Sequence, residues 1–315
     1  MIQKGQLTSP NMLRYHTLKK KPAHFKSFTG FTVEEFENLA DEIHLDWAEL
    51  QKSFYKPEKK RLRKYGGGRK LKLATLEDQL LLALVWVKLY CTNCLLEYLF
   101  GIDETKIKGY RKRIQPLFQN LFLLPKDKRK KIRTLEELRK IIPDLDAVIS
   151  DATEQQISRP GKKRKQRKYY SGKKKKHTVK TQITSTVSTY ILDVSESVEG
   201  KRSDYKLLQE SGVLKWIRNL KLYVDLGYQG IDSDFPEINA VIPRKKPRGK
   251  PQTRSNKIFN RKMSRIRVRV ENAIAKLKKF RVLGEKFRHN LKDYNATFRM
   301  IASLVNFRTL QRNFE

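Results

Sequence analysis

Cysteine is scarce in this 315-residue chain, which contains only Cys91 and Cys94. A single Cys-x-x-Cys pair with no second pair of ligands nearby is weak evidence for a zinc site. Because both cysteines lie in an apolar helical stretch, we interpret them as two reduced thiols in the core. The glycine run at 66–68 lacks the strand and the Lys-Ser/Thr of a phosphate-binding loop, so we interpret it as a flexible link.

Long apolar runs are also absent. No stretch approaches the roughly 20 apolar residues that cross a bilayer, and the polar N-terminus has no cleavable apolar core. We therefore expect an intracellular protein without membrane contact. Hydrophobic residues still make up 38% of the chain, which is enough to bury a core and predicts a globular protein.

Acidic residues are too few to balance the basic ones. There are 70 Lys and Arg against 33 Asp and Glu, which gives a formal net charge of +37. Such an excess is self-repelling in a compact protein and indicates a polyanionic partner, DNA or RNA. Charge alone would also suit a ribosomal or chromatin-like protein, but the core and the placement of the acids argue against that alternative.

Helical patterns dominate the first 125 residues. Residues 31–50 predict an amphipathic helix with Thr32 as its N-cap, and residues 76–89 predict a helix buried on most of its surface. A short helix at 95–100, a turn at Gly101 and a third, basic helix follow, which is the helix-turn-helix pattern. The side chains expected to reach DNA from the third helix are Lys108, Arg111, Lys112 and Arg113. A plain helical bundle with a basic solvated face is the alternative.

From residue 146 the pattern changes to strands that alternate with helices. The expected strands are 146–152, 177–186, 189–195, 221–225 and 239–243, and the expected helices are 203–211, 261–280 and 292–312. This order predicts an α/β domain with a mixed sheet and helices on both faces. It matches the RNase H-like arrangement, as an analogy at the level of the fold.

Two acids end strands in this region. Asp151 closes the first strand and Asp225 closes the fourth. Groups at the carboxyl ends of strands face the crevice where ligands bind, so the two acids converge if their strands are neighbours. Glu154, three residues after the first acid, is either a supplementary ligand or a hydrogen-bond partner, and we favour the latter.

A third acid, Glu271, lies midway along the helix at 261–280. It forms one stripe with Ser264, Arg267 and Lys278, beside an apolar stripe that can pack on the sheet. Arg267 could keep Glu271 ionised, and Lys278 could contact a phosphate. Three carboxylates in a basic crevice would hold two hard cations. Ordinary surface pairing along a helix is the alternative.

Two basic segments flank these acids. Residues 159–180 contain twelve Lys and Arg and no acid, and their place beside the first strand lets them reach along bound DNA. The expected phosphate contacts are Lys163, Arg164, Lys165, Lys173, Lys174, Lys175, Lys176 and His177. A solvated charge run is the alternative. The Pro-rich segment 243–257 is expected to be mobile until DNA binds.

Four motifs in order resemble the insertion-sequence-five family of bacterial DDE transposases, relatives of the eukaryotic Harbinger elements. They are SDATEQQISRP (150–160), YYSGKKKKHTVKTQ (169–182), DLGYQG (225–230) and SRIRVRVENAIAKLKKFR (264–281). The resemblance extends from about residue 30 to 312 and implies that Asp151, Asp225 and Glu271 are the catalytic metal ligands. The family's usual Gly-x-x-His-Asp stands here at 200–204 with Ser203 in place of His, so no role of that imidazole is carried over.

The resemblance implies a transposase that binds the terminal inverted repeats of an insertion sequence, cleaves the DNA and joins the 3′-OH ends to target DNA. Two Mg²⁺ ions, for which Mn²⁺ substitutes, would serve a homodimer on double-stranded DNA in the bacterial cytoplasm, at the nucleoid. The expected parts are a mobile N-terminus (1–25), a helical DNA-binding region (26–125), a linker (126–145) and an RNase H-like catalytic domain (146–315). A domesticated RNase H-like nuclease and a non-catalytic DNA-binding protein are the alternatives.

Overall fold

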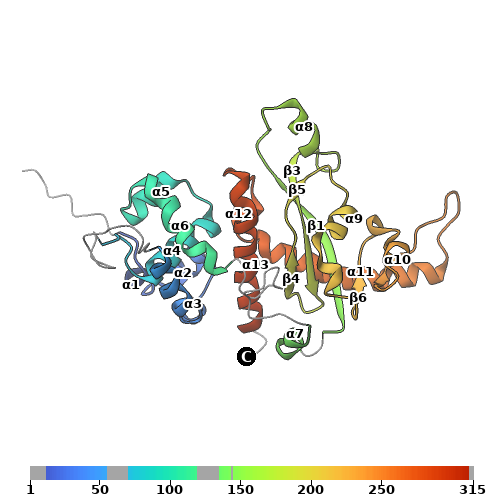
Figure 1. Ribbon diagram of the computed structural model, residues 1–315, viewed down its shortest axis with the longest axis horizontal. Coiled ribbons are helices and arrows are strands. Elements are labelled where there is room, and N and C mark those ends of the chain that lie inside the picture. Colours follow the sequence, from blue (N-terminus) through green and yellow to red (C-terminus); the bar gives the residue numbers. More distant parts are fainter. Residues whose placement is uncertain (1–11, 55–69, 119–134, 143–144, 312–315) are drawn as a thin grey trace, which may run out of the picture. The chain divides into compact units, whose positions relative to one another are not determined.

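The computed structural model describes residues 12–54, 70–118, 135–142 and 145–311 (Figure 1). The chain divides into two compact units, residues 1–117 with 280–282 and residues 118–279 with 283–315. The glycine run at 66–68, residues 1–11 and the linker up to residue 134 lie outside the described residues. Among the helices that are described, none is both long and apolar enough to cross a membrane.

The described part of the first unit is helical. Its elements are α1 (Tyr15–Leu18), α2 (Pro22–Thr29), α3 (Val33–Ser53), α4 (Leu76–Leu89), α5 (Asn93–Phe100) and α6 (Glu104–Phe118). Threonine hydroxyls begin three of them: Thr32, Thr75 and Thr92 each accept a hydrogen bond from the backbone N–H three residues on. Such a cap stabilises a helix by about 1 kcal/mol, so the sequence fixes these helix starts locally.

The sequence indicated a mobile N-terminus over residues 1–25. In the structure, α1 and the first half of α2 lie within residues 12–25. Pro22 stands at the start of α2, where the missing N–H costs nothing, and Gly30 ends it in the left-handed conformation at φ 82°. Leu18 and Phe25 are buried. Short helices of this kind are stabilised by packing rather than by a long periodic pattern.

The helix-turn-helix pattern is present in α5 and α6. Gly101 closes α5 at φ 63°, a conformation that glycine adopts without strain, and the carboxylate of Asp103 accepts the N–H of Thr105 at the start of α6. The expected core position of the two cysteines is wrong. Cys91 is half-buried and Cys94 is exposed, because α4 ends at Leu89 and both residues fall on the connection to α5 and on its first turn.

The second unit combines a sheet with helices on both sides. Its strands are β1 (Ala147–Gln156), β2 (Tyr170–Ser171), β3 (Lys176–Thr186), β4 (Ile191–Val194), β5 (Val198–Glu199), β6 (Lys221–Tyr223) and β7 (Asn239–Val241). Its helices are α7 (Leu135–Ile141), α8 (Lys163–Tyr169), α9 (Asp204–Ser211), α10 (Ile231–Asp234), α11 (Arg254–Lys278) and α13 (Tyr294–Gln311); α12 (Arg281–Gly284) follows α11, and short 3₁₀ turns are η1 (Val213–Lys215), η2 (Leu226–Tyr228) and η3 (Leu291–Asp293).

The sheet has the predicted mixed topology. Its order is β2-β3-β1-β6-β7, and β4 and β5 also pair with β3. Strand β3 is antiparallel to β1 and β4, whereas β1, β6 and β7 are parallel. This is the mixed α/β sheet that the order of strands and helices predicted. The first and fourth predicted strands, β1 and β6, are therefore direct neighbours, which is the condition for Asp151 and Asp225 to converge.

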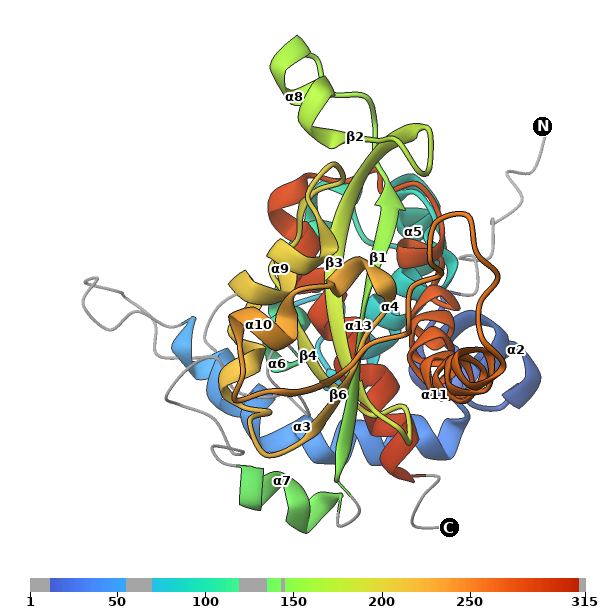
Figure 2. The same ribbon diagram turned by 90° about the vertical axis from the view of Figure 1, so that its right-hand side faces the viewer.

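Helices cover both faces of this sheet, with α9 on one side and α11 and α13 on the other (Figures 1 and 2). On the α9 side, Val148 and Leu222 pack with Leu208 in one buried cluster. On the other side, Val270 and Leu277 of α11 are fully or almost fully buried, which confirms the apolar stripe predicted for that helix. The packing fixes the helix that carries Glu271 against the strand that carries Asp151.

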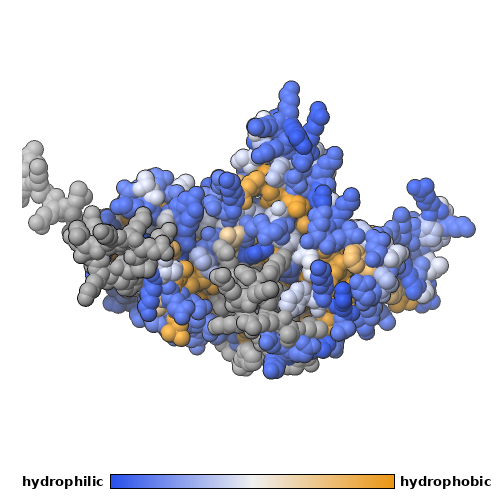
Figure 3. All heavy atoms as spheres, in the orientation of Figure 1, coloured by the Kyte–Doolittle hydropathy of each residue, from blue (hydrophilic) through white to orange (hydrophobic). Residues whose placement is uncertain are grey.

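The basic segment between β1 and β3 is ordered as an arm, which we define as residues 159–177. It contains α8 and β2, neither of which the charge run predicted. Gln166 stabilises the turn before α8, because its amide donates to the carbonyl of Pro160 and accepts from Arg159. The arm extends beyond the rest of the sheet and carries a hydrophilic surface (Figures 1 and 3).

The second basic segment also has local structure. Helix α11 begins at Arg254, seven residues earlier than predicted, because the hydroxyl of Thr253 caps it. Arg244 is held by the side chains of Asn256 and Asn260, and its guanidinium lies over the ring of Phe259. These contacts tie the segment to the first turns of α11, where the sequence indicated a mobile connection.

Candidate active site

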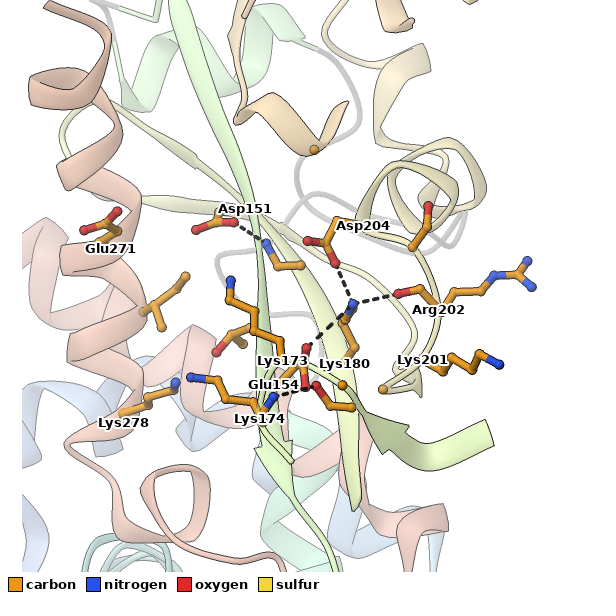
Figure 4. A pocket seen from close by; sticks show the side chains of 18 residues that line it. Asp151, Glu154, Lys173, Lys174, Lys180, Lys201, Arg202, Asp204, Glu271 and Lys278 are labelled. Carbon is orange, nitrogen blue, oxygen red and sulfur yellow. Dashed lines mark hydrogen bonds and ion pairs between the residues drawn. The ribbon is translucent and has the colours of Figure 1, made fainter. Parts of the chain in front are cut away.

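A cleft of about 640 Å³ opens beside the part of β1 that lies beyond its pairing with β6. Four carboxylates line it together with a larger number of basic side chains (Figure 4). The acids are Asp151 and Glu154 of β1, Asp204 of α9 and Glu271 of α11. The lysines and the arginine are Lys173, Lys174, Lys180, Lys201, Arg202 and Lys278.

Asp151 lies within β1, and the prediction that it closes this strand is wrong. The antiparallel pairing with β3 continues to Gln156, whereas the parallel pairing with β6 stops at Ile149. Asp151 therefore stands just past the end of the parallel pairing, where the edge of β1 is open to the cleft. Burial raises the pKa of this carboxyl, the N–H of Ala152 and the charge of Arg267 act against that rise, and two neighbouring acids add to it.

Asp225 lies two residues after the end of β6, whereas the sequence predicted that it closes a strand at 221–225. It does stand directly before a turn, as predicted. Its carboxylate begins the turn η2 by accepting the N–H of Leu226 at 2.8 Å. The guanidinium of Arg267 lies 3.1 Å from the same carboxylate oxygen. Arg267 was expected to keep Glu271 ionised, but the ion pair it forms is with Asp225, because the cation on α11 points to the end of β6.

Glu271 is an exposed residue of α11 that lines the cleft. Asp151 and Glu271 lie on the same side of β1 in Figure 4. Lys278, two turns further along the same helix, lines the cleft as well. Helix α11 thus contributes an acid and a base to one wall, as the stripe in the sequence predicted.

The donor set suits hard divalent cations, because every acid in the cleft offers carboxylate oxygens. The carboxylates of Asp204 and Asp225 repel that of Asp151, and a bound cation would offset this repulsion. As the side chains lie, no three His, Cys, Asp or Glu within the described ranges form a group that could enclose one ion. The carboxylate of Asp225 is instead paired with the guanidinium of Arg267.

The opposite wall holds Glu154, for which the sequence left two roles open, together with Lys180 and Asp204, which the sequence did not assign to the site. Glu154 accepts the hydroxyl of Thr178 at 2.8 Å, which supports its interpretation as a hydrogen-bond partner. Lys180 lies opposite Glu154 on β3 and forms ion pairs with Glu154 and, at 2.7 Å, with Asp204. The only signal for Asp204 was its place at the end of the motif at 200–204.

The basic rim of the cleft comes from α11 and from the turn between β2 and β3. Lys173 and Lys174 lie on this turn and line the cleft, and Lys175 closes it in the left-handed conformation at φ 53°. Desolvation lowers the pKa of Lys278, and the nearby charge of Lys174 lowers it further. Positive charges held this close together favour an anionic group between them.

The remaining residues of the predicted DNA contact on the arm do not line the cleft. Lys163, Arg164 and Lys165 are exposed on α8. Lys175, on the turn before β3, and Lys176, at the start of β3, are exposed as well. His177 is half-buried, and its ring packs edge to face on the exposed ring of Tyr170. Among the predicted contacts of the arm, Lys173 and Lys174 line the cleft, whereas the other lysines and the arginine are exposed to solvent outside it.

The four predicted contacts of α6 fall into two groups. Lys108 and Lys112 are exposed and one turn apart. Arg111 stacks on the ring of Trp86 at 3.9 Å, and Arg113 donates to the side chain of Gln51. The two arginines thus also hold α6 against other helices of the first unit.

Comparisons with known proteins agree with both units. A model of the helix-turn-helix of DDE superfamily endonucleases matches residues 71–123, and a model of the DDE superfamily endonuclease itself matches residues 150–306. A probable transposase for insertion sequence element IS702 from Microchaete diplosiphon is 30% identical over 285 residues, which cover 90% of this chain and 93% of that protein. No solved structure matches.

Proposed function

Because this chain belongs to the DDE superfamily transposases, we propose that it binds the ends of a mobile DNA element, cleaves the DNA there and joins the freed 3′-OH to target DNA. The observation that carries this proposal is the arrangement of Asp151, Asp225 and Glu271. Asp151 and Glu271 line one cleft from β1 and α11. Asp225 follows the neighbouring strand β6, and its charge acts on Asp151.

The three acids would hold the divalent cations, Mg²⁺ with Mn²⁺ as a substitute. When bound, two such ions activate an attacking oxygen and stabilise the leaving oxygen of a phosphodiester. Asp151 must lose its proton to bind a cation, and burial opposes this loss because it raises the pKa of Asp151. The charge of Arg267 acts in the favourable direction by lowering that pKa.

The basic residues of the cleft position the DNA backbone. Lys173, Lys174 and Lys278 surround a space next to the acids, where a phosphate would relieve their mutual repulsion. No side chain is needed as a covalent nucleophile, since water attacks in cleavage and the freed 3′-OH attacks in joining. The side chains of the protein would bind and orient the phosphodiester at the element's end and that of the target DNA, and would neutralise their charge.

Two further surfaces would bind the element's end outside the cleft. Helix α6 follows the turn at Gly101 as the second helix of a helix-turn-helix, which enters the major groove of DNA. The basic arm would follow the backbone of the same duplex through its exposed lysines and arginines. Because two element ends must be brought together, we infer a homodimer on DNA.

Substitution of the acids tests this function. Asp225→Ala or Glu271→Ala is expected to abolish Mg²⁺-dependent cleavage of a duplex that carries the element's end. Binding of the same duplex, measured by fluorescence anisotropy, should change little, because neither residue contributes a positive charge. An equal loss of binding and cleavage would refute the assignment of these residues as metal ligands.

A further inference from the structure

Lys180 is an unusual residue for its position in the sheet. It stands in the middle of β3, and only 8% of its surface is exposed. A buried ammonium group is costly unless it is paired and hydrogen-bonded. The structure supplies three partners, which come from two separate segments of the chain, β1 and residues 202–204.

The partners of Lys180 surround its ammonium group. The carboxylate of Asp204 lies 2.7 Å from Nζ, and that of Glu154 lies 3.7 Å from it. The carbonyl oxygen of Arg202 accepts a hydrogen bond from Nζ at 2.6 Å. Strand β1, the loop before α9 and the first residue of α9 are thereby joined to β3 at one point on the wall of the cleft (Figure 4).

Glu154 and Asp204 are not equivalent in this arrangement. Glu154 also accepts the hydroxyl of Thr178, and its side chain is only 9% exposed. Asp204 is 37% exposed at its side chain and lines the cleft. Its charge acts on Asp151, whose pKa is raised first by burial and then also by Asp204 and Asp225. Asp204 therefore faces the same space as Asp151 and Glu271, two of the three proposed metal ligands.

We propose that Lys180 is a positioning residue that holds Asp204 at the wall of the cleft, where Asp204 acts as a fourth carboxylate toward the divalent cation. This inference rests on the proposed function, because it assumes that Asp151 binds such a cation. Ser203 supports the arrangement from the other side, since its hydroxyl caps α9 and fixes the backbone at Asp204.

The positioning role predicts the direction in which cation affinity changes when Lys180 is removed. A lysine that merely competes with the metal would raise cation affinity when it is removed, since one positive charge would leave the cleft. A lysine that holds a ligand in place would lower cation affinity when it is removed, because Asp204 would lose its fixed position. Partners that orient a ligand without touching the metal typically contribute about 10- to 100-fold to metal affinity.

The experiment measures Mn²⁺ binding to the DNA-free, full-length protein by electron paramagnetic resonance. Asp204→Asn and Lys180→Met are each expected to weaken binding by about tenfold or more. Lys201→Met is the matched control, because it removes one positive charge from the same cleft without touching the Lys180 pair; Mn²⁺ binding should be unchanged or tighter. Circular dichroism checks that each variant is folded.

Four outcomes separate the inference from the function on which it rests. Weaker binding by Asp151→Asn, Asp204→Asn and Lys180→Met supports both. Weaker binding by Asp151→Asn alone leaves the proposed function standing and overturns the role of Asp204. Tighter binding by Lys180→Met overturns the positioning role, and it does so even if that variant is less stable. Unchanged binding by Asp151→Asn would remove the metal assignment itself.

Discussion

The guanidinium of Arg267 lies 3.1 Å from the carboxylate of Asp225, although the two residues belong to different elements 42 positions apart in the chain. The pair joins α11 to the end of β6, and it places a positive charge on an acid that the proposed chemistry needs for a metal ion. A metal cation that binds the carboxylate of Asp225 must therefore share this carboxylate with Arg267 or displace the guanidinium of Arg267.

Arg267→Gln should for that reason bind Mn²⁺ more tightly than the wild type in the absence of DNA. Asp225 is 45% exposed at its side chain, so the pair is screened by solvent, and a gain of about two- to fivefold is expected. Arg269→Gln is the control, since that residue is exposed on the same helix and does not pair with Asp225. Weaker binding by Arg267→Gln would show that the guanidinium orders the site instead of competing with the metal.

Asp151→Asn should stabilise the metal-free protein at neutral pH. Burial raises the pKa of Asp151 in the folded state, so the protonated form favours folding, and this contribution is lost as pH rises through the raised pKa. The amide carries no charge at any pH and avoids this loss. A gain on the order of 1 kcal/mol would raise the Tm by about 2–4 °C in a domain of this size.

The pH dependence separates this effect from a general change in packing. Thermal melts with a chelator should show the gain at pH 7 and a smaller gain near pH 4, about the ordinary pKa of aspartate. Asp225→Asn provides the contrast, because it breaks the ion pair with Arg267 and should give no gain. An Asp151→Asn variant that is less stable than the wild type at pH 7 would contradict the account.

Gly200→Ala should destabilise the wall of the cleft. A Cβ at this position would lie 2.0 Å from the hydroxyl of Thr178 and 2.9 Å from its carbonyl oxygen, so that the backbone must move. Overpacking of this kind costs about 1–3 kcal/mol, and it would also disturb the hydrogen bond from Thr178 to Glu154. Gly172→Ala, which adds a Cβ in open space, should leave the urea midpoint of unfolding nearly unchanged.

The double variant Lys108→Gln, Lys112→Gln should weaken binding of the element's end without changing stability. Both lysines are exposed on α6, and the loss of two phosphate contacts reduces the slope of log affinity against log salt by about 1.8. Arg111→Gln should lower the Tm as well, because the stacking on Trp86 is lost. An unchanged salt slope in the double variant would exclude these lysines from the DNA contact.

Much of the fold was predictable because its signals are local. Thr32 with Glu35 forms a capping box, and Ser203 caps α9, so the starts of these helices follow from short-range hydrogen bonds. The order of strands and helices predicted the mixed sheet. The sequence also placed Asp225 directly before a turn, although β6 ends two residues earlier than predicted. The comparisons support DDE transposases as a group, while membership of the insertion-sequence-five family remains a prediction.

The features that the sequence did not predict depend on contacts between residues that are distant in the chain. The length of β1 beyond Asp151 is set by its pairing with β3, which no pattern within 146–152 reveals. The ion pair of Asp204 with Lys180 spans 24 positions, and Arg267 was assigned to the nearer acid on its own helix. Helix α8 formed inside a run of like charges because Gln166 holds the preceding turn.

The joining reaction tests the central claim most directly. The protein is incubated with a duplex that carries the element's end and a pre-exposed 3′-OH, together with a supercoiled plasmid and Mg²⁺. We expect a covalent product in which the duplex end is joined to plasmid DNA, and we expect it to be absent with Asp151→Asn although that variant still binds the duplex. Failure of the wild-type protein to form any joined product, while it binds the end and cleaves DNA, would contradict the account and leave a nuclease.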